Sequence, residues 1–480
     1  MSQRPNILFL MADQMQARVL NPRHGCITPN FDRLAARGVR LINAYTSNAI
    51  CSPARAGMMT GLLPHNHGVL TVTHLVDDDQ CCLRTEHPHW AQRLADAGYL
   101  TGYFGKWHVE RSNDLRRFGW QVDCGSDGDR MRSRMQAAHR EVSQAGLKHA
   151  RYYQTPGYAR SVFYGTTSIP PEQRGMGIAA TEAIGFLDEA LGNGQPWCCF
   201  VSVSEPHDPF VASERALARY DVDAIELPGN LNDDLSGRPG IYRKAARVWQ
   251  DVSEREHREA AACYYASITE IDEQFGRLLD RLEQSDQLDN TIVVLTGDHG
   301  ELLGAHGLYC KNFSAAEEVY NIPLIVAGPG IAEGTVSTAR VGSHDLCPTL
   351  LQLTGCKPID VPDSCSFAAV LTDPRRQEAS YTRGYAEYHG GRYMLTQRIA
   401  WDGPWKFVFN GFDFDELYNL EQDPWEMQNL IDEPAHRGRV EQMMSYVWQK
   451  IRDTNDHSLL NSHYPILRIA PVGPLILEEQ

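Results

Sequence analysis

Short, uninterrupted apolar runs alternate along this chain with stretches of helical spacing, and this alternation restricts the fold more than any other feature. Apolar runs cover Asn6–Met11, Trp197–Val203 and Thr291–Thr296, with further strand-like segments at Val39–Tyr45 and Tyr99–Phe104. Such runs are typical of strands buried on both faces of a parallel sheet. Helical spacing marks residues 30–37, 89–97 and 258–282. We therefore predict an α/β fold, a mostly parallel sheet with helices on both faces.

The pattern changes after about residue 375. Short strands are predicted at Gly391–Leu395, Arg398–Trp401 and Lys406–Phe409, with turns such as Asp402-Gly403-Pro404 between them. We predict a catalytic α/β domain over residues 1–375 and a C-terminal subdomain over 376–480, with a small antiparallel sheet and an apolar tail. Residues 124–175 and 205–255 have irregular sequences, and long loops of this kind commonly shape a binding site.

Charge and composition exclude several classes of protein. The net charge is −16 and no basic run offsets it, which argues against a nucleic-acid partner. No apolar segment is long enough to cross a membrane, and the N-terminal run lacks a signal-peptide cleavage site. We expect a cytoplasmic protein whose twelve cysteines are mostly reduced thiols that fill the core.

The segment His463–Leu477 is apolar and interrupted by proline, and it would be poorly tolerated as a free tail. Docking on its own subunit and docking on a partner agree about equally well with the sequence. We favour docking on a partner, and therefore a homo-oligomer, either a dimer or a tetramer.

Polar residues follow four of the predicted strands at the point where each strand ends. They are Asp13-Gln14, Lys106-Trp107-His108, Glu205-Pro206-His207-Asp208 and Asp298-His299. In a parallel sheet, ligands bind beyond the carboxyl ends of the strands. A single pair of this kind is more often a solvated loop, but four pairs at four strand ends predict an active site.

The central motif is Cys51-Ser52-Pro53-Ala54-Arg55, which leads into the helical run Ala56–Gly61. A cysteine at a helix N-terminus beside an arginine has a lowered pKa and can act as a nucleophile. A buried structural cysteine before a proline in the first helical turn explains the local pattern about as well. The residues alone leave both interpretations open.

The Cys-x-Pro-x-Arg pattern followed by Thr60-Gly61 resembles the signature of the sulfatases of the alkaline phosphatase superfamily. The resemblance extends over most of the chain and is greatest to the bacterial branch of choline sulfatases and phosphonate monoester hydrolases. It is carried by Pro5-Asn6-Ile7 with Asp13, Thr28-Pro29-Asn30 with Leu34-Ala35, Cys51–Gly61, Gly105–His108, Pro206–Pro209, Thr296–Glu301, Lys311 and Leu417–Leu420. It implies an alkaline-phosphatase-like α/β fold and a sulfuric ester hydrolase.

The family also implies a metal site and a modified residue. In sulfatases the signature cysteine is oxidised to formylglycine, so the resemblance predicts this change at Cys51 and a formylglycine-generating enzyme as a maturation partner. One divalent cation would be held by Asp13, Gln14, the converted Cys51, Asp298 and His299. Many sulfatases have two adjacent Asp residues where this chain has Asp13-Gln14, and the Gln also occurs in the phosphonate monoester hydrolase branch. Hard oxygen ligands suit Ca²⁺, and the histidine makes Mn²⁺ an alternative.

The remaining catalytic residues follow from the same resemblance. Arg55, Lys106 and Lys311 would neutralise charge on the sulfuryl oxygens. His207 with Lys311 would bind the ester and protonate the leaving alcohol, and His108 would take the proton from the second hydroxyl of the aldehyde hydrate. Asp208, Glu301 and His306 receive no catalytic assignment, and His65 and His67 are expected near the site.

The predicted reaction is hydrolysis of small-molecule sulfate monoesters, as in arylsulfatases, through a covalent sulfo-enzyme intermediate. One alternative is a phosphonate monoester or phosphodiester hydrolase with the same machinery, and another is an inactive homologue that binds anions. Val72 stands where the choline sulfatase and phosphonate hydrolase branch has a substrate-contacting Asn, and Thr71 or Thr73 is a candidate replacement. The sequence shows no clear aromatic cage for a quaternary ammonium group, for which Trp107, Tyr164 and Tyr388 are the candidates.

Overall fold

The centre of the fold is a seven-stranded sheet in the order β10-β2-β9-β8-β1-β6-β3. The computed structural model of the chain describes residues 4–77, 81–84, 88–112, 114–122, 128–144, 146–155, 157–311, 314–391, 394–460 and 465–478. The sheet consists of β1 (Asn6–Asp13), β2 (Gly38–Tyr45), β3 (Leu100–Gly105), β6 (Trp197–Pro206), β8 (Thr291–Gly297), β9 (Leu324–Ala327) and β10 (Thr335–Gly342). Among these seven, β9 alone is antiparallel to its neighbours, which confirms the predicted mostly parallel sheet.

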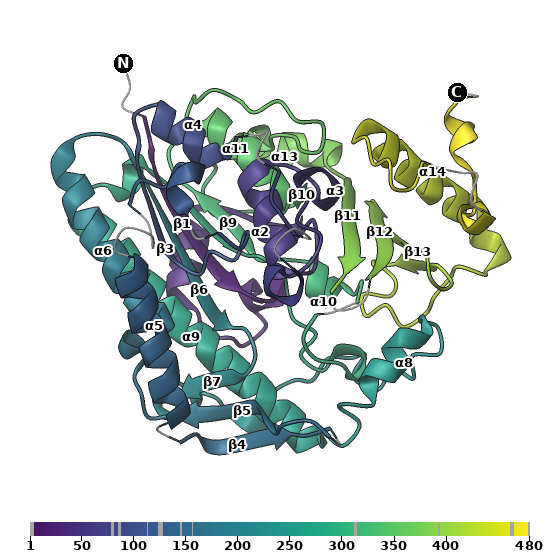
Figure 1. Cartoon of the computed structure of the whole chain (residues 1–480), viewed down its shortest axis with the longest axis horizontal. Coiled ribbons are helices and arrows are strands. Elements are labelled where there is room, and N and C mark those ends of the chain that lie inside the picture. The colour runs from purple at the N-terminus through teal and green to yellow at the C-terminus, as the bar shows by residue number, and fades with distance from the viewer. Residues whose placement is uncertain are drawn as a thin grey trace.

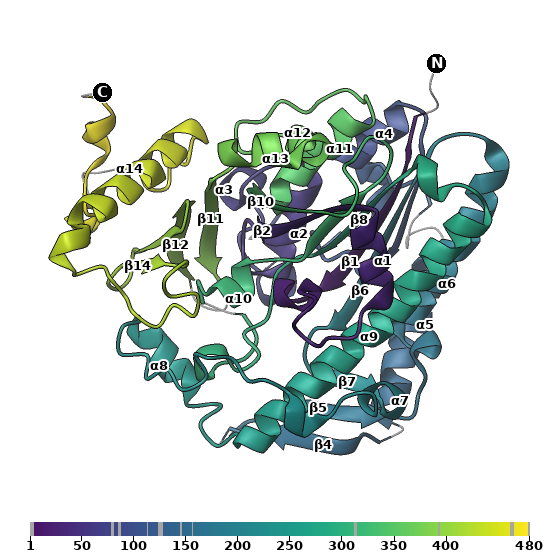
Figure 2. The same cartoon turned by 180° about the vertical axis from the view of Figure 1, so that it is seen from behind.

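Helices cover both faces of this sheet, and this is why its central strands are apolar without interruption. In Figures 1 and 2, α1 (Pro29–Ala36), α6 (Gly175–Asn193) and α9 (Glu254–Gln284) pack together on one face, and α2 (Cys51–Thr60), α4 (Trp90–Asp96) and α11 (Leu346–Leu353) on the other. Shorter helices are α3 (Pro64–His67), α7 (Glu214–Leu217), α8 (Gly240–Ala246), α10 (Glu317–Tyr320), α12 (Ala368–Thr372) and α13 (Pro374–Gln377).

The long helix α9 begins at a local sequence signal. The hydroxyl of Ser253 accepts a hydrogen bond from the backbone N–H of Glu256 (3.3 Å), and the Glu256 carboxylate accepts the backbone N–H of Ser253 (2.8 Å). This reciprocal pair satisfies two donors that have no partner within the helix. The predicted helix over 258–282 is therefore confirmed, with a start four residues earlier.

The segments predicted to be irregular contain regular structure. Residues 128–144 form helix α5 (Gly128–Gln144). The strands β4 (Lys148–Tyr153), β5 (Ser161–Thr167) and β7 (Phe210–Ser213) form a three-stranded sheet. Figure 1 shows this small sheet beside α9, at the edge of the molecule. Its strands are short and β4 is half-exposed, so no continuous apolar run marks them in the sequence. Residues 124–127 lie outside the described residues.

The C-terminal region contains the predicted antiparallel sheet, but its strands differ from those predicted. They are β11 (Arg383–Gly390), β12 (Met394–Asp402), β13 (Trp405–Asn410) and β14 (Glu416–Asn419). The strands predicted at Gly391–Leu395 and Arg398–Trp401 correspond to the single strand β12, and β11 was not predicted; residues 392–393 lie outside the described residues. Polar Gln397 and Arg398 lie where the prediction divided this strand, and both are buried and hydrogen-bonded in the middle of β12.

Helix α14 (Arg437–Asp453) packs on this sheet through Val440, Met443, Met444, Val447 and Ile451. The described part of the apolar tail, residues 465–478, lies along the same helix, where the indole of Trp448 donates to the carbonyl of Val472 (2.6 Å). Ile469 and Leu475 nevertheless remain 56% and 65% exposed. The tail thus docks on its own subunit, while the homo-oligomer and the domain boundary at 375/376 stay predictions. His463 and Tyr464 lie outside the described residues.

A buried ionic network joins α3 to the C-terminal sheet. His65 donates through Nδ1 to Glu387 (2.6 Å) and through Nε2 to the carbonyl of Thr454 (3.0 Å), so both ring nitrogens carry protons. Glu387 also accepts from His389 (3.0 Å). Burial alone lowers the pKa of His65, but Glu387 outweighs it and raises that pKa to about 9. His65, which was expected near the active site, takes part in this structural contact.

This network predicts a loss of stability in mild alkali. A histidine whose pKa is raised on folding stabilises the folded state fully below its unfolded value and loses that contribution as pH rises through the folded value. The free energy of unfolding should therefore fall by on the order of 2 kcal/mol between about pH 6.5 and pH 9.5, and thermal midpoints should fall with it. His65→Gln should flatten this part of the profile, and an equally steep profile in that variant would contradict the assignment.

None of the described helices is both long and apolar enough to cross a membrane.

Every cysteine among the described residues has a free thiol, and Cys51, Cys198, Cys199 and Cys347 are among the buried ones.

Candidate active site

Cys51 is the first residue of α2 and lies at the floor of a cavity. The residue before it, Ile50, is extended, and Pro53 occupies the first helical turn, where its missing N–H has no cost. The helix ends at Gly61, which has φ 76°, a value that disfavours other residues. Cys51 is only 2% exposed, so the fold presents a shielded sulfur atom at a helix N-terminus.

The four predicted strand ends surround this helix because β8, β1, β6 and β3 are neighbours in the sheet. Asp298-His299 follows β8, Asp13-Gln14 lies at the end of β1, His207-Asp208 follows β6 and Lys106 follows β3. The structure therefore brings together residues that are as many as 285 positions apart in the sequence, Asp13 and Asp298. The position of ligand-binding residues at the carboxyl ends of parallel strands is the one expected for this architecture.

Three of the predicted metal ligands and Cys51 converge on one point. Possible ligand atoms of Asp13, Cys51, Asp298 and His299 all lie within 4.8 Å of one another. His299 donates through Nδ1 to the carbonyl of Gly300 (2.9 Å), so its Nε2 carries the lone pair. That Nε2 lies 3.7 Å from Oδ1 of Asp13 and 3.7 Å from Oδ1 of Asp298. Buried acceptor atoms that face one another repel unless a cation lies between them, so these residues fit a divalent metal ion.

Arg55 holds the two carboxylates in place. Its guanidinium donates to Oδ2 of Asp298 (2.7 Å) and Oδ2 of Asp13 (3.1 Å), and the side chain is fully buried. It also donates to the Lys106 carbonyl (2.9 Å) and the Ser202 hydroxyl (2.9 Å). Arg55 contacts only the Oδ2 atoms of the two carboxylates, and the Oδ1 atoms lie 3.7 Å from Sγ of Cys51 or Nε2 of His299. Arg55 thus acts on the site through the carboxylates.

Positive charge gathers around Cys51 despite the negative charge of the whole protein. Lys106 forms an ion pair with Asp13, and Lys311 is 6% exposed. Burial disfavours the thiolate, but Lys106 and Lys311 outweigh burial and hold the pKa of the Cys51 thiol well below its usual range. Burial also raises the pKa of Asp13, whereas Lys106 and Arg55 lower it well below its usual range. An anion is therefore stabilised at this position.

Lys311 and His207 are joined by a hydrogen bond. The Lys311 ammonium donates to Nε2 of His207 (2.7 Å), and His207 donates through Nδ1 to the Asp208 carbonyl (2.9 Å). The same ammonium donates to Oε1 of Gln14 (2.5 Å). On the other side of Cys51, His108 hydrogen-bonds to His74 (3.2 Å) and adjoins the sulfur atom, whose pKa it lowers. The ionisable side chains of Lys311, His207 and His108 thus adjoin Cys51.

These groups open into a cavity of about 1620 Å³. Cys51, Lys106, His108, His207 and Lys311 line its floor, and Met135, Ala138 and Val142 of α5 line one wall. Of the aromatic candidates, Trp107 lines the cavity, whereas Tyr164 is hydrogen-bonded to Glu259 (2.6 Å) and Tyr388 is buried beside Ile50. Val72 and Thr73 also line the cavity, whereas Thr71 is not among its lining residues. Of the two threonines considered as replacements for the substrate-contacting Asn, Thr73 therefore has the suitable position.

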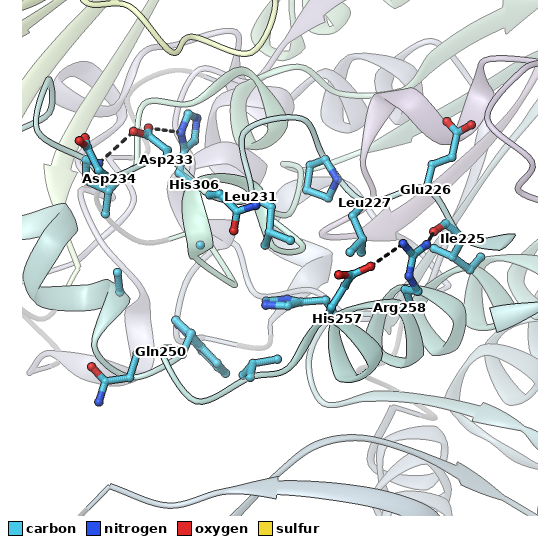
Figure 3. A pocket seen from close by; sticks show the side chains of 18 of the residues that line it. Ile225, Glu226, Leu227, Leu231, Asp233, Asp234, Gln250, His257, Arg258 and His306 are labelled. Carbon is cyan, nitrogen blue, oxygen red and sulfur yellow. Dashed lines mark hydrogen bonds and ion pairs between the residues drawn. The ribbon is translucent and has the colours of Figure 1, made fainter. Parts of the chain in front are cut away.

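A second cavity of about 1010 Å³ lies between α8 and the start of α9 (Figure 3). His306 lies in its wall, but its ring is satisfied: Nδ1 donates to Asp233 (2.7 Å) and Nε2 accepts from Asn230 (3.0 Å) and Arg238 (3.0 Å). His257 is likewise hydrogen-bonded to Tyr309 (2.6 Å). These contacts give His306 a structural role.

Sequence reasoning left out Ser202 and His74 and gave Asp208 and Glu301 no catalytic role, but all four contact residues of the predicted site. Ser202 binds Arg55, His74 binds His108, and Asp208 and Glu301 both accept from the side-chain amide of Gln14. Glu301 follows the Gly-Asp-His-Gly run, which was a usable signal, whereas Ser202 and His74 have no sequence pattern that marks them.

The sheet order, the Cys-x-Pro-x-Arg helix and the convergent carboxylates define an α/β enzyme of the alkaline phosphatase superfamily. A family model described as Sulfatase matches residues 5–356, and one described as N-sulphoglucosamine sulphohydrolase, C-terminal, matches residues 304–454. The chain belongs to the sulfatase family and is a sulfuric ester hydrolase.

Individual relatives agree with this assignment. A choline-sulfatase of Rhizobium meliloti is 30% identical over 94% of this chain and 86% of its own length, and the uncharacterized sulfatase YidJ of Escherichia coli is 29% identical over 94% and 88%. The solved structure of a phosphonate monoester hydrolase from Silicibacter pomeroyi has a TM-score of 0.76 at 22% identity, covering 95% of this chain and 97% of the other. The predicted resemblance to this branch is confirmed.

Proposed function

We propose that this enzyme hydrolyses sulfate monoesters of small alcohols, with Cys51 converted to formylglycine as the nucleophile. The observation that carries the proposal is the meeting of Cys51, Asp13, Asp298 and His299 at the floor of a cavity flanked by Lys106 and Lys311. This arrangement supports attack by a group at position 51 on a tetrahedral anion held by two ammonium groups.

The proposed first half-reaction transfers the sulfuryl group. The aldehyde at position 51 adds water to give a geminal diol. One hydroxyl releases its proton to water in the cavity and attacks sulfur, and the bond from sulfur to the alcohol oxygen breaks with its electron pair on that oxygen. The proton shared by Lys311 and His207 passes to that oxygen, so that a neutral alcohol leaves. Lys106 and Lys311 neutralise charge on the sulfuryl oxygens, and Arg55 keeps Asp13 and Asp298 oriented.

The proposed second half-reaction regenerates the aldehyde. His108 removes the proton from the remaining hydroxyl, the carbonyl re-forms and the carbon–oxygen bond to the sulfate breaks, so that sulfate leaves with its electron pair. No second attack on sulfur is needed. A serine or an unconverted cysteine at position 51 has no second hydroxyl and stops after the first half-reaction.

Asp13, Asp298 and His299, with the converted Cys51 and Gln14, would hold the divalent cation, Ca²⁺ or alternatively Mn²⁺. When bound, such an ion acts as a Lewis acid and lowers the pKa of an adjacent hydroxyl. Its predominantly oxygen ligand set favours Ca²⁺.

A phosphonate monoester or phosphodiester hydrolase is the second candidate. It is favoured by the charge of the site, because these esters carry one negative charge, as sulfate monoesters do, and by the similarity to a phosphonate monoester hydrolase. Lys106, Lys311 and His207 respond to tetrahedral shape and charge rather than to sulfur as such. Carbon–oxygen cleavage also tolerates a substituent that stays on phosphorus. An inactive anion-binding homologue would keep an unmodified thiol at Cys51 and show no turnover.

A substrate panel with a common leaving group tests the assignment. We expect kcat/KM to be highest for 4-nitrophenyl sulfate, measurable for 4-nitrophenyl phenylphosphonate and bis(4-nitrophenyl) phosphate, and lower than the sulfate value for 4-nitrophenyl phosphate. The phosphate monoester carries nearly two charges, because its second pKa is about 6. Protein in which conversion of Cys51 has been verified by peptide mass should be used. A preference for the phosphate monoester would overturn the sulfatase assignment, and a preference for the phosphonate would establish the second candidate.

Maturation by a formylglycine-generating enzyme is part of this proposal, because the mechanism requires the aldehyde. The cytoplasmic location and the dimer or tetramer stay predictions from the sequence.

A further inference from the structure

Both N–H groups and one oxygen lone pair of the Gln14 side-chain amide are hydrogen-bonded, and the backbone of Gln14 is left-handed. Its Nε2 donates to Oδ1 of Asp208 (3.1 Å) and to Oε2 of Glu301, and its Oε1 accepts from Lys311 (2.5 Å). Lys311 can only donate, so the amide has one possible orientation. Its φ is 65°, which is uncommon for a residue with a Cβ. The Gln14 N–H donates to Asp298 (3.0 Å) and its carbonyl accepts from Tyr264 (2.6 Å).

Glu301 connects Gln14 to the loop that carries Lys311. While its Oε2 accepts from Gln14, its Oε1 accepts the backbone N–H groups of Leu303 (3.0 Å) and Cys310 (2.6 Å). Cys310 precedes Lys311 directly and has φ 65°, the same left-handed conformation as Gln14. Non-glycine residues persist in this conformation when surrounding contacts hold them, and such residues cluster at functional sites. Glu301 is fully buried, and its two oxygens hold both of these residues.

From these contacts we infer that Glu301 is a positioning residue of the reaction, which aligns the Gln14 amide and Lys311 as one hydrogen-bonded unit with His207. The inference rests on the proposed function, because it concerns the proton delivered to the leaving alcohol. The order of contacts is Glu301 to Gln14, Gln14 to Lys311, and Lys311 to His207. Neither Glu301 nor the Gln14 amide nitrogen lines the cavity, so the effect on the substrate passes through Lys311.

The variant Glu301→Gln isolates the link to Gln14. The carbonyl oxygen of a glutamine at position 301 can still accept from Leu303 and Cys310, which leaves its amide nitrogen facing the amide nitrogen of Gln14. Two donors then oppose each other, and the Gln14 amide loses a charged acceptor. We expect kcat/KM for phenyl sulfate to fall by about 10–100-fold, as for loss of a hydrogen bond to a charged group.

The leaving group distinguishes a positioning role from a general structural role. Phenyl sulfate needs protonation of its leaving oxygen more than 4-nitrophenyl sulfate does, because nitrophenolate is the more stable anion. Glu301→Gln should therefore lower kcat/KM several-fold more for phenyl sulfate than for 4-nitrophenyl sulfate. Equal losses for the two esters would overturn the inference. Glu416→Gln removes a buried carboxylate from the C-terminal sheet and is the matched control. It should leave kcat/KM unchanged for both phenyl sulfate and 4-nitrophenyl sulfate.

A double-mutant cycle tests whether Glu301 acts through Gln14. Gln14→Met removes the amide, and in that background Glu301→Gln should cost less than about threefold, because the contact it disrupts is already absent. Additive losses would overturn the inference. If the wild-type enzyme hydrolyses no sulfate ester, the proposed function fails, and calorimetric binding of inorganic sulfate becomes the deciding measurement. Glu301→Gln should weaken that binding several-fold by displacing Lys311, and an unchanged affinity would overturn the inference independently.

Discussion

Replacing Cys51 with alanine should abolish multiple turnover while leaving the fold intact, with kcat at least about 10³-fold lower, as when other enzymes lose their nucleophile. Cys51 is 2% exposed and begins a helix that its neighbours Pro53 and Ala54 also favour, so the smaller side chain should cost only about 1 kcal/mol of stability. Peptide mass mapping of the wild-type protein should show a fraction of residue 51 that has lost sulfur and gained aldehyde reactivity.

Two controls separate the chemistry of Cys51 from its packing. Cys347→Ala removes another buried free thiol, in α11, and should retain activity. Cys51→Ser supplies one hydroxyl without a second, so we expect at most a single turnover that leaves a sulfate ester on the protein, detectable as added mass. If Cys51→Ala keeps most of the wild-type activity, the covalent mechanism is wrong.

Arg55→Met should destabilise the metal-free protein by about 3–5 kcal/mol, the usual cost of removing one partner from a buried ion pair. The guanidinium is the shared partner of Asp13 and Asp298, and all three side chains are fully buried. Without it the two carboxylates face each other with Lys106 as the remaining cation on Asp13. Thermal midpoints at a fixed scan rate, in the presence of a chelator, measure the loss.

Added divalent metal should distinguish this site from an ordinary buried pair. In Arg55→Met the carboxylates have lost a competing positive charge, so Mn²⁺ should bind more tightly and raise the thermal midpoint by more than it does in the wild type. Arg398→Met removes an equally buried arginine from Asp456 and should be comparably destabilised, with only the wild-type response to Mn²⁺. The same Mn²⁺-induced shift in all three proteins would place the metal elsewhere.

The parallel sheet could be predicted because its central strands are buried on both faces and are therefore apolar throughout, as Thr291–Thr296 is. The small sheet of β4, β5 and β7 could not be predicted, because its strands are short and partly exposed. They therefore show neither an apolar run nor a regular alternation of apolar and polar residues in the sequence. The prediction divided strand β12 just before Arg398, at two neighbouring polar residues, Gln397 and Arg398. Their burial depends on Asn410 and Asp456, whose positions only the tertiary structure supplies.

The sequence predicted which residues would lie close together in the candidate site, but not which hydrogen bonds they would form. Asp13, Cys51, Asp298 and His299 meet as the strand-end argument and the resemblance required. Gln14 illustrates what the sequence could not provide. The sequence predicted that Gln14 lies beside a metal ion, but it did not predict which carboxylates accept hydrogen bonds from the Gln14 amide. These carboxylates belong to Asp208 and Glu301, which are 194 and 287 positions away. Such pairings depend on side-chain directions that no spacing rule specifies.

The burial of Cys51 has a consequence for the timing of protein synthesis. The side chains that enclose it come from strand ends as late as Asp298, so a ribosome must add 247 further residues before the enclosure can close. At translation rates of about 5–20 residues per second this takes roughly 12–50 s. The maturation enzyme that we propose would therefore compete with the completion of β8, and a chain that folds first would keep an unconverted thiol. Slower translation or slower folding should then increase the active fraction.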